Sequence, residues 1–258
     1  MSLRALIFDV DGTLAETEKD GHRVAFNLAF AKKGLPWHWD VDLYGSLVEI
    51  GGGKERIKHY ISHYQPSFAP DQPLEEFIKE LHSLKNRYYR QILENHSLPL
   101  RIGVKRLIRE AKDEGIKLAV ASTASEDNVK ALLETLFPEE KGWFEVIAAG
   151  DMVANKKPSP DIYLLALEKL NLSPRECLAI EDTQQGLKAA VAAGLKTVVT
   201  VSQYSQGQDF QEAILVLNHL GEPDFPFQVI KGNPHGYQFF SISLARKIIE
   251  HPFVAYKI

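Results

Sequence analysis

Two aspartates, Asp9 and Asp11, lie two residues apart where a short apolar run, residues 5–8, gives way to Gly12. Residues i and i+2 of an extended chain point to the same side, so both carboxylates can face one volume beyond a buried strand. Two like charges at that spacing repel, and a Mg2+ ion held by carboxylates and by phosphate oxygens of a substrate is the usual solution. The pair therefore predicts magnesium-assisted phosphate chemistry, and a simple Asp-Gly turn is the structural alternative.

Three further polar segments follow later apolar runs of the chain. Ser122-Thr123 comes directly after one run, Lys157 follows Gly150-Asp151, and Glu181-Asp182 follows another run. Hydroxyls, a lysine and an acidic pair beside Asp9 and Asp11 are the groups that phosphoryl transfer requires. Each also has a structural reading: Ser122 as a helix cap, and the acidic pair as a favourable charge at a helix N-terminus.

The elements that must position these residues fall into two blocks. Residues 17–95 carry apolar side chains at three- and four-residue spacing, which is typical of helices. Beyond residue 100 helical stretches alternate with short apolar runs at 117–121, 144–147, 177–180 and 196–200, the pattern of βαβ units and a parallel sheet. We predict an α/β fold: a Rossmann-like parallel-sheet core from residues 1–14 and 98–220, an inserted all-helical cap at 15–97, and an extension at 221–258 packed on the core.

Open parallel sheets bind ligands outside the carboxyl ends of their strands, where Asp9 and Asp11 are expected. The predicted cap would close over that edge. The expected partner is therefore a small molecule bound between cap and core.

Composition argues against several other classes of protein. The 258 residues are 45% hydrophobic with a formal net charge of -4, so a sizeable core is expected and a basic nucleic-acid groove is not. No apolar run reaches the roughly 18 residues of a membrane-spanning helix. A single cysteine fits a reducing compartment. We expect a cytoplasmic monomer, or a protein of an organelle stroma if a transit peptide was removed, that binds neither nucleic acid nor membrane.

Taken together, the four ordered motifs resemble those of the haloacid dehalogenase-like superfamily over roughly residues 3–210. The resemblance implies that Asp9 is the nucleophile that forms an aspartyl phosphate, and that Asp11 is the general acid and then the general base. It implies that Ser122 holds a phosphoryl oxygen and that Lys157 neutralises charge beside Asp9. The implied magnesium ligands are Asp9, Asp11 and Asp182, with Glu181 acting directly or through water.

Within that superfamily the chain is most similar to the CbbY-like group, on the segments 15–18, 51–56, 156–163, 202–204 and 209–210. The resemblance implies a magnesium-dependent sugar-phosphate phosphatase whose favoured substrate is xylulose 1,5-bisphosphate. The glycine-rich turn before Lys54 offers backbone amides for a second phosphate, although it is also consistent with a plain hinge. The candidate substrate-binding residues are Glu18, Gly52, Gly53, Lys54, Arg56 and Thr123.

Two departures from the group are visible. His22 lies six residues after Glu16 where relatives place it five after, which makes Gly21 a candidate insertion and puts contact between His22 and substrate in question. The extension from residue 221 also exceeds the usual core.

Two other functions compete with this reading. A β-phosphoglucomutase shares the fold and the first step but returns the phosphate to another sugar hydroxyl, and it depends on cap closure to exclude water. A catalytically silent binding protein on the same fold is disfavoured because the clustered charges of Asp9, Asp11, Lys157 and Asp182 would have no function there.

Overall fold

The computed structural model describes residues 2–95, 98–140 and 142–250. Its centre is a seven-stranded sheet in the order β3-β2-β1-β4-β5-β6-β7, in which all neighbouring strands are parallel except β6 and β7. The strands are β1 (Ala5–Phe8), β2 (Lys117–Ala121), β3 (Phe144–Ala148), β4 (Cys177–Glu181), β5 (Lys196–Thr200), β6 (Leu215–Leu217) and β7 (Val229–Gly232). The predicted α/β fold is confirmed.

Alternate residues of each central strand enter different hydrophobic clusters. In β1, Leu6 and Phe8 join one cluster while Ala5 and Ile7 join another, as the two-residue period of a strand requires. The first cluster includes apolar side chains of α5 (Val104–Asp113), α6 (Glu126–Leu136) and α9 (Ile242–Glu250), and the second those of α7 (Asp161–Leu170). Helix α8 (Gln184–Ala192) contributes to the second cluster too, and the short 3-10 helix η2 (Pro174–Glu176) leads into β4. The sheet is therefore buried on both faces.

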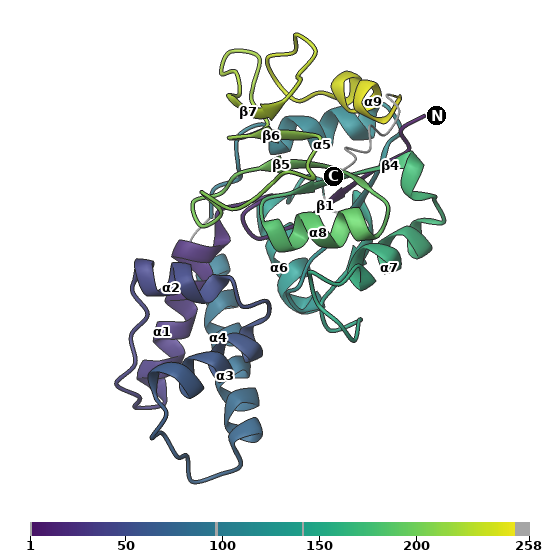
Figure 1. The fold of residues 1–258 in the computed structure, drawn as a ribbon. Coiled ribbons are helices and arrows are strands. Elements are labelled where there is room, and N and C mark those ends of the chain that lie inside the picture. The colour runs from purple at the N-terminus through teal and green to yellow at the C-terminus, as the bar shows by residue number, and fades with distance from the viewer. Residues whose placement is uncertain (1, 96–97, 141, 251–258) are drawn as a thin grey trace.

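The residues between β1 and α5 form a separate helical lobe beside the sheet (Figure 1). Its elements are the π-helical turn η1 (Glu18–His22) and the helices α1 (Arg23–Lys32), α2 (Val41–Val48), α3 (Gly53–Tyr64) and α4 (Leu74–Asn95). The lobe has a core of its own, centred on buried aromatic side chains such as Phe26, Phe30, Trp39 and Tyr44. The two chain crossings lie side by side, because Ala15 and Leu100 form an antiparallel bridge.

The segment after residue 221 adds two elements to the sheet layer. Helix α9 packs its apolar face into the main core with Ile242, Leu244 and Ile248. Strand β7 was not expected. It pairs with β6 at the edge of the sheet, where it leaves Val229 and Ile230 exposed.

Candidate active site

The register of the sheet brings the predicted site residues to one edge. Phe8 at the end of β1 lies level with Val120 of β2 and with Ile180 of β4. Asp9, Ser122 and Glu181 therefore leave the sheet at the same carboxyl edge, although more than a hundred residues separate the first from the second.

Asp9 forms an ion pair with a buried lysine that comes from a different loop. The Asp9 carboxylate is 8% exposed and accepts a hydrogen bond from Lys157 Nζ at 2.7 Å. Lys157 Nζ also donates to Glu181, and the Tyr163 hydroxyl donates to the same Glu181 oxygen. Burial would lower the pKa of Lys157, but the two carboxylates outweigh it and raise that pKa, so the lysine stays cationic beside Asp9.

Three carboxylates form a compact acidic group with ligand oxygens within 4.8 Å of one another, and they belong to Asp9, Glu181 and Asp182. Burial raises the pKa of Asp9 well above its ordinary value and that of Asp182 to about 8, and the charge of Glu181 adds to both shifts. Asp182 Oδ1 is buried and has no hydrogen-bond partner among the described residues. An all-oxygen group of this kind suits a hard divalent cation such as Mg2+, so the residues present fit the implied metal.

Gly12 makes room for this group. Its φ of +89° lies in the left-handed region, and a Cβ placed on it would lie 2.1 Å from Asp182 Oδ2. The glycine that follows Asp11 is therefore required both by its backbone conformation and by the close approach of Asp182.

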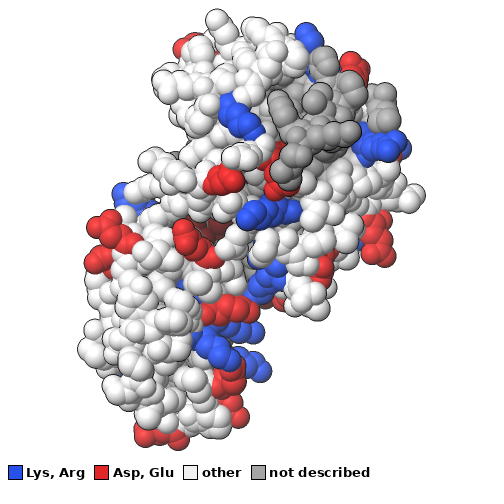
Figure 2. Space-filling model, in the orientation of Figure 1, with Lys and Arg blue, Asp and Glu red and all other residues white. Residues whose placement is uncertain are grey.

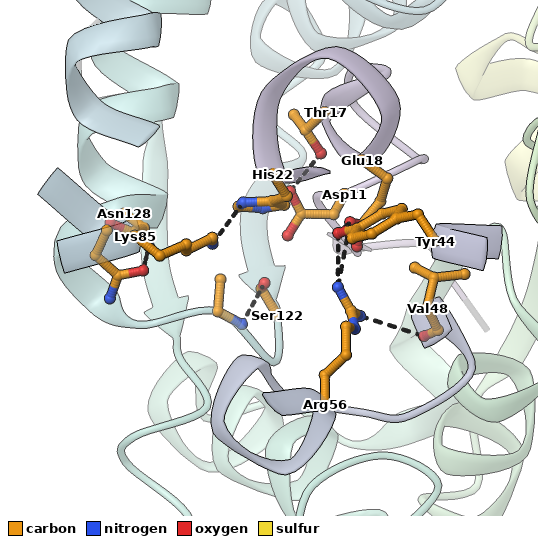
Figure 3. A network of polar contacts seen from close by, with 12 residues as sticks. Asp11, Thr17, Glu18, His22, Tyr44, Val48, Arg56, Lys85, Ser122 and Asn128 are labelled. Atoms are coloured by element: carbon orange, nitrogen blue, oxygen red, sulfur yellow. Dashed lines mark hydrogen bonds and ion pairs between the residues drawn. The ribbon is translucent and has the colours of Figure 1, made fainter. Parts of the chain in front are cut away.

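The Asp11 carboxylate is not part of this acidic group, and it belongs to a network of polar contacts with Thr17 and His22 (Figure 3). It accepts hydrogen bonds from the Thr17 hydroxyl and from His22 Nε2, the latter at 2.9 Å. Burial would raise the pKa of Asp11, but His22, Thr17 and the charge of Lys85 outweigh it and lower that pKa to about 2. Asp11 lines the small cavity together with Asp9 and Asp182, so its predicted roles as metal ligand and as acid-base residue both stay predictions.

His22 connects Asp11 to a lysine of the cap. Lys85 Nζ lies 2.8 Å from His22 Nδ1, and Lys85 is only 4% exposed, with its ammonium over the ring of Tyr89. Burial lowers the pKa of Lys85 to about 8, so at neutral pH it donates to Nδ1 and leaves the Nε2 proton of His22 for Asp11.

Sequence reasoning missed Lys85 and left His22 in question. Lys85 lies on the buried face of α4 with Leu81, Leu84 and Tyr89. A lysine among the apolar residues of a helix is rarely buried without a partner, and this pattern in the sequence could have identified it. The π-helical turn η1 spans Gly21 and carries His22 to Asp11, and such turns hold one residue more than α-helical ones.

Glu18 is held by two residues of α2 and α3. The Tyr44 hydroxyl donates to Glu18, and Arg56 Nη1 lies 3.6 Å from the Glu18 carboxylate. Arg56 also donates to the Tyr44 hydroxyl at 2.6 Å and to the carbonyl of Val48 at 3.3 Å. Arg56 thus orients Glu18 and also lines both cavities, and its predicted role in binding the substrate stays a prediction.

A cavity of about 480 Å3 extends from Asp11 between the cap and the core. A smaller cavity of about 90 Å3 lies beside Asp9, Lys157 and Asp182. Both cavities are lined by Asp11, Glu18, Gly52, Arg56 and Thr123. The larger one is also lined by Gly53 and Lys54, so all six predicted substrate-binding residues line this cavity.

Comparison with known protein families matches residues 3–194 to the haloacid dehalogenase-like hydrolases. The chain belongs to this family. A CbbY protein of Cupriavidus necator is 47% identical over 235 residues, which are 90% of this chain and 92% of the relative. A phosphorylated carbohydrates phosphatase of Thermotoga maritima is 30% identical over 89% of this chain and 99% of its own length.

Among solved structures, a mutant of CbbY from Rhodobacter sphaeroides in complex with xylulose-(1,5)bisphosphate is similar to this chain. Its sequence is 44% identical and its TM-score is 0.78, over 84% of this chain and 94% of that one. These relatives confirm the predicted CbbY-like group, and the chain is a sugar-phosphate phosphatase of the haloacid dehalogenase-like family.

In this haloacid dehalogenase-like hydrolase, Ser122 is next to the cavity-lining Thr123 in the chain. It is 1% exposed, it lines neither cavity in the described structure, and its Oγ accepts a hydrogen bond from the amide of Ala124 at 3.1 Å. Thr123 lines both cavities instead. The Ser122 hydroxyl proton is still available to a phosphoryl oxygen, because the recorded bond uses Oγ only as an acceptor.

A buried arginine that sequence reasoning missed ties the catalytic loop of this hydrolase to the later strands. Arg101 donates to the backbone carbonyls of Gly12, Thr200, Val201 and Asn218, the last three at 2.7–2.9 Å. It lies in the second crossing between cap and core and pairs with Glu16 of the first crossing at 3.2 Å. No sequence pattern singled it out, because its partners are backbone atoms of three separate loops.

Charges on the outside of the molecule are mixed. Figure 2 shows basic and acidic side chains interspersed over the face in view. Among the described residues no helix is long and apolar enough to span a membrane.

Proposed function

We propose that this phosphatase hydrolyses xylulose 1,5-bisphosphate in a magnesium-dependent reaction through an aspartyl phosphate on Asp9. The observation that carries the proposal is the buried ion pair of Asp9 and Lys157 at 2.7 Å, beside a three-carboxylate group and a cavity large enough for a sugar bisphosphate. The relative solved with xylulose-(1,5)bisphosphate supports the choice of substrate.

The first step forms a phosphorus–oxygen bond to the Asp9 carboxylate and breaks the bond from phosphorus to the sugar oxygen. The leaving oxygen takes a proton from Asp11, which lines both cavities. Burial is outweighed by His22, Thr17 and Lys85, which hold the pKa of Asp11 at about 2 in the free protein, so Asp11 takes up that proton when the phosphate charge of the bound substrate raises its pKa. Lys157 neutralises charge on the transferred group, and Ser122 donates to one of its oxygens.

The second step returns Asp9 to its starting state. Asp11, now a carboxylate, takes a proton from water as the water oxygen attacks phosphorus, and the phosphorus–oxygen bond to Asp9 breaks. Asp9 is a carboxylate again, Asp11 holds the proton taken from water, and inorganic phosphate leaves.

Magnesium, when bound by Asp9, Asp182 and Glu181, would neutralise the phosphoryl oxygens and let the clustered carboxylates ionise together. Glu181 is the weaker ligand candidate, because Lys157 and Tyr163 already occupy one of its oxygens.

The experiment is a phosphate-release assay with magnesium on xylulose 1,5-bisphosphate, ribulose 1,5-bisphosphate, fructose 1,6-bisphosphate and β-glucose 1-phosphate, with Asp9→Asn as the control. Selective, magnesium-dependent release from the xylulose compound that is lost in the variant is the expected result. Conversion of β-glucose 1-phosphate to the 6-phosphate without free phosphate would identify a mutase instead. Equal release from every compound would refute the substrate assignment.

A further inference from the structure

We propose that His82 is a specificity-determining residue, which donates a hydrogen bond to a second phosphate of the substrate held beside Lys54. The inference rests on the proposed function, because it concerns the end of a bisphosphate that does not react. His82 belongs to α4 of the cap and lines the larger cavity.

The position of His82 along α4 fits a substrate that spans the cavity. His82 precedes Lys85 by three residues, so the two side chains lie on one face of the helix about 4.5 Å apart along its axis. Lys85 leads through His22 to Asp11, which is the reacting end of the site. His82 is therefore displaced from the reacting end by almost one helical turn, toward the part of the cavity lined by Gly52 and Gly53.

The ring of His82 packs directly on the start of α3. A Cβ placed on Gly53 would lie 2.5 Å from His82 Nε2 and 2.6 Å from its Cδ2, so only glycine leaves room for the imidazole. No hydrogen bond to the ring is recorded within residues 2–95, 98–140 and 142–250, which leaves a polar edge of His82 without a partner in the cavity wall.

The surroundings of His82 are positively charged. Burial, together with the charges of Lys85, Lys54, Lys156 and His22, lowers the pKa of His82 to about 3. The ring is therefore a neutral imidazole that can donate one N–H, and an anion bound beside it would relieve the repulsion among its basic neighbours.

The acidic side chains that line this cavity are already engaged. Asp11 is paired with His22, Glu18 with Tyr44 and Arg56, and Glu55 with Lys156 at 3.1 Å. Asp151 accepts from the amide of Glu126. Lys54 forms no ion pair with a carboxylate among the described residues, so its ammonium is available to an anion bound next to His82. A phosphate dianion fits this place better than a sugar hydroxyl does.

The experiment compares His82→Gln with His63→Gln, an exposed histidine near the end of α3 that does not line the cavity. Both changes are made in the active protein and in an Asp9→Asn background, where binding of xylulose 1,5-bisphosphate is measured by calorimetry. Turnover of p-nitrophenyl phosphate, which has no second phosphate, is the reference reaction in the active protein.

We expect His82→Gln to raise Kd and KM for the bisphosphate roughly 10- to 100-fold, the range for a lost hydrogen bond to a charged group. The kcat for p-nitrophenyl phosphate should stay within about twofold, and His63→Gln should change neither substrate. In the Asp9→Asn protein with His82 intact, the nitrogen resonances of the neutral His82 ring should shift when the bisphosphate binds, because its N–H gains an anionic acceptor.

Equal effects of His82→Gln on both substrates, no effect on the bisphosphate, or an unmoved His82 resonance would overturn the inference. Failure of the proposed function would look different. Wild-type protein would then release no phosphate from any substrate, while binding to the Asp9→Asn protein would still depend on His82.

Discussion

Replacement of Gly12 by alanine tests whether the close approach of Asp182 to the catalytic loop is needed for the metal site. The new Cβ would lie 2.1 Å from Asp182 Oδ2 and 2.8 Å from Asp182 Cγ. A carbon–oxygen contact needs about 3.3 Å, so the carboxylate would have to move by roughly 1.2 Å. Metal ligands keep their distances within about 0.2 Å, so a shift of that size takes Asp182 out of a shared site.

Two effects with separate readouts are expected. The magnesium concentration for half-maximal activity should rise roughly 10- to 100-fold, as it does when the contacts that orient a ligand are lost. The left-handed conformation of residue 12 should cost about 1–2 kcal/mol of unfolding free energy once a Cβ is present. That cost corresponds to a fall in Tm of roughly 2–8 °C.

Gly236→Ala is the matched control. Gly236 has a φ of +84°, close to the +89° of Gly12, but a Cβ placed there meets no atom within 4 Å. The control should lose stability to a similar extent and keep its magnesium dependence. A Gly12→Ala protein with unchanged half-maximal magnesium would refute the reasoning, because the backbone cost alone would then explain the variant.

Three further predictions concern other parts of the site. Asp9→Asn should abolish phosphate release while the circular dichroism spectrum is kept, and residual turnover near the wild-type rate would exclude Asp9 as the nucleophile. Lys85→Met should lower kcat about 10- to 100-fold, a part of what acid-base catalysis contributes. Because burial lowers the pKa of Lys85 to about 8, wild-type kcat should decline as pH rises through 8 and the ammonium loses its proton, and that limb should vanish in the variant. Arg101→Met should reduce the free energy of unfolding by roughly 3 kcal/mol or more in urea titrations, since buried carbonyls lose their donor. Arg246→Met, which breaks an exposed ion pair with Glu114, is the control that should change little.

The fold could be predicted from the chain because its signals are local. Alternating helices and short apolar runs are read directly from neighbouring residues, and they gave four of the parallel strands besides β1. Strands β6 and β7 were missed because they are short, at three and four residues, and β7 is stabilised by pairing at the sheet edge and not by an apolar run of its own.

Only some residues of the candidate site could be predicted from the sequence, for a related reason. Asp9, Lys157 and Asp182 stand in motifs that follow strands, so parallel topology alone brings them to one edge. Lys85, His82 and Arg101 stand in no motif. Lys85 and His82 belong to the site because the cap lies against the carboxyl edge of the sheet. Arg101 belongs to it because the two segments that join cap and core lie side by side.

The sequence by itself therefore determined which chemical groups the site holds: Asp9, Asp11 and the acidic pair Glu181-Asp182, each at the end of a strand, because these depend on residue type and on local order. Only the tertiary structure decided how that chemistry is supported. It placed the Asp11 carboxylate against His22, which in turn contacts Lys85, and it placed Arg56 beside Glu18. The physical reason is that the direction of a buried polar side chain is set by the partners that satisfy it, and these partners come from distant parts of the chain.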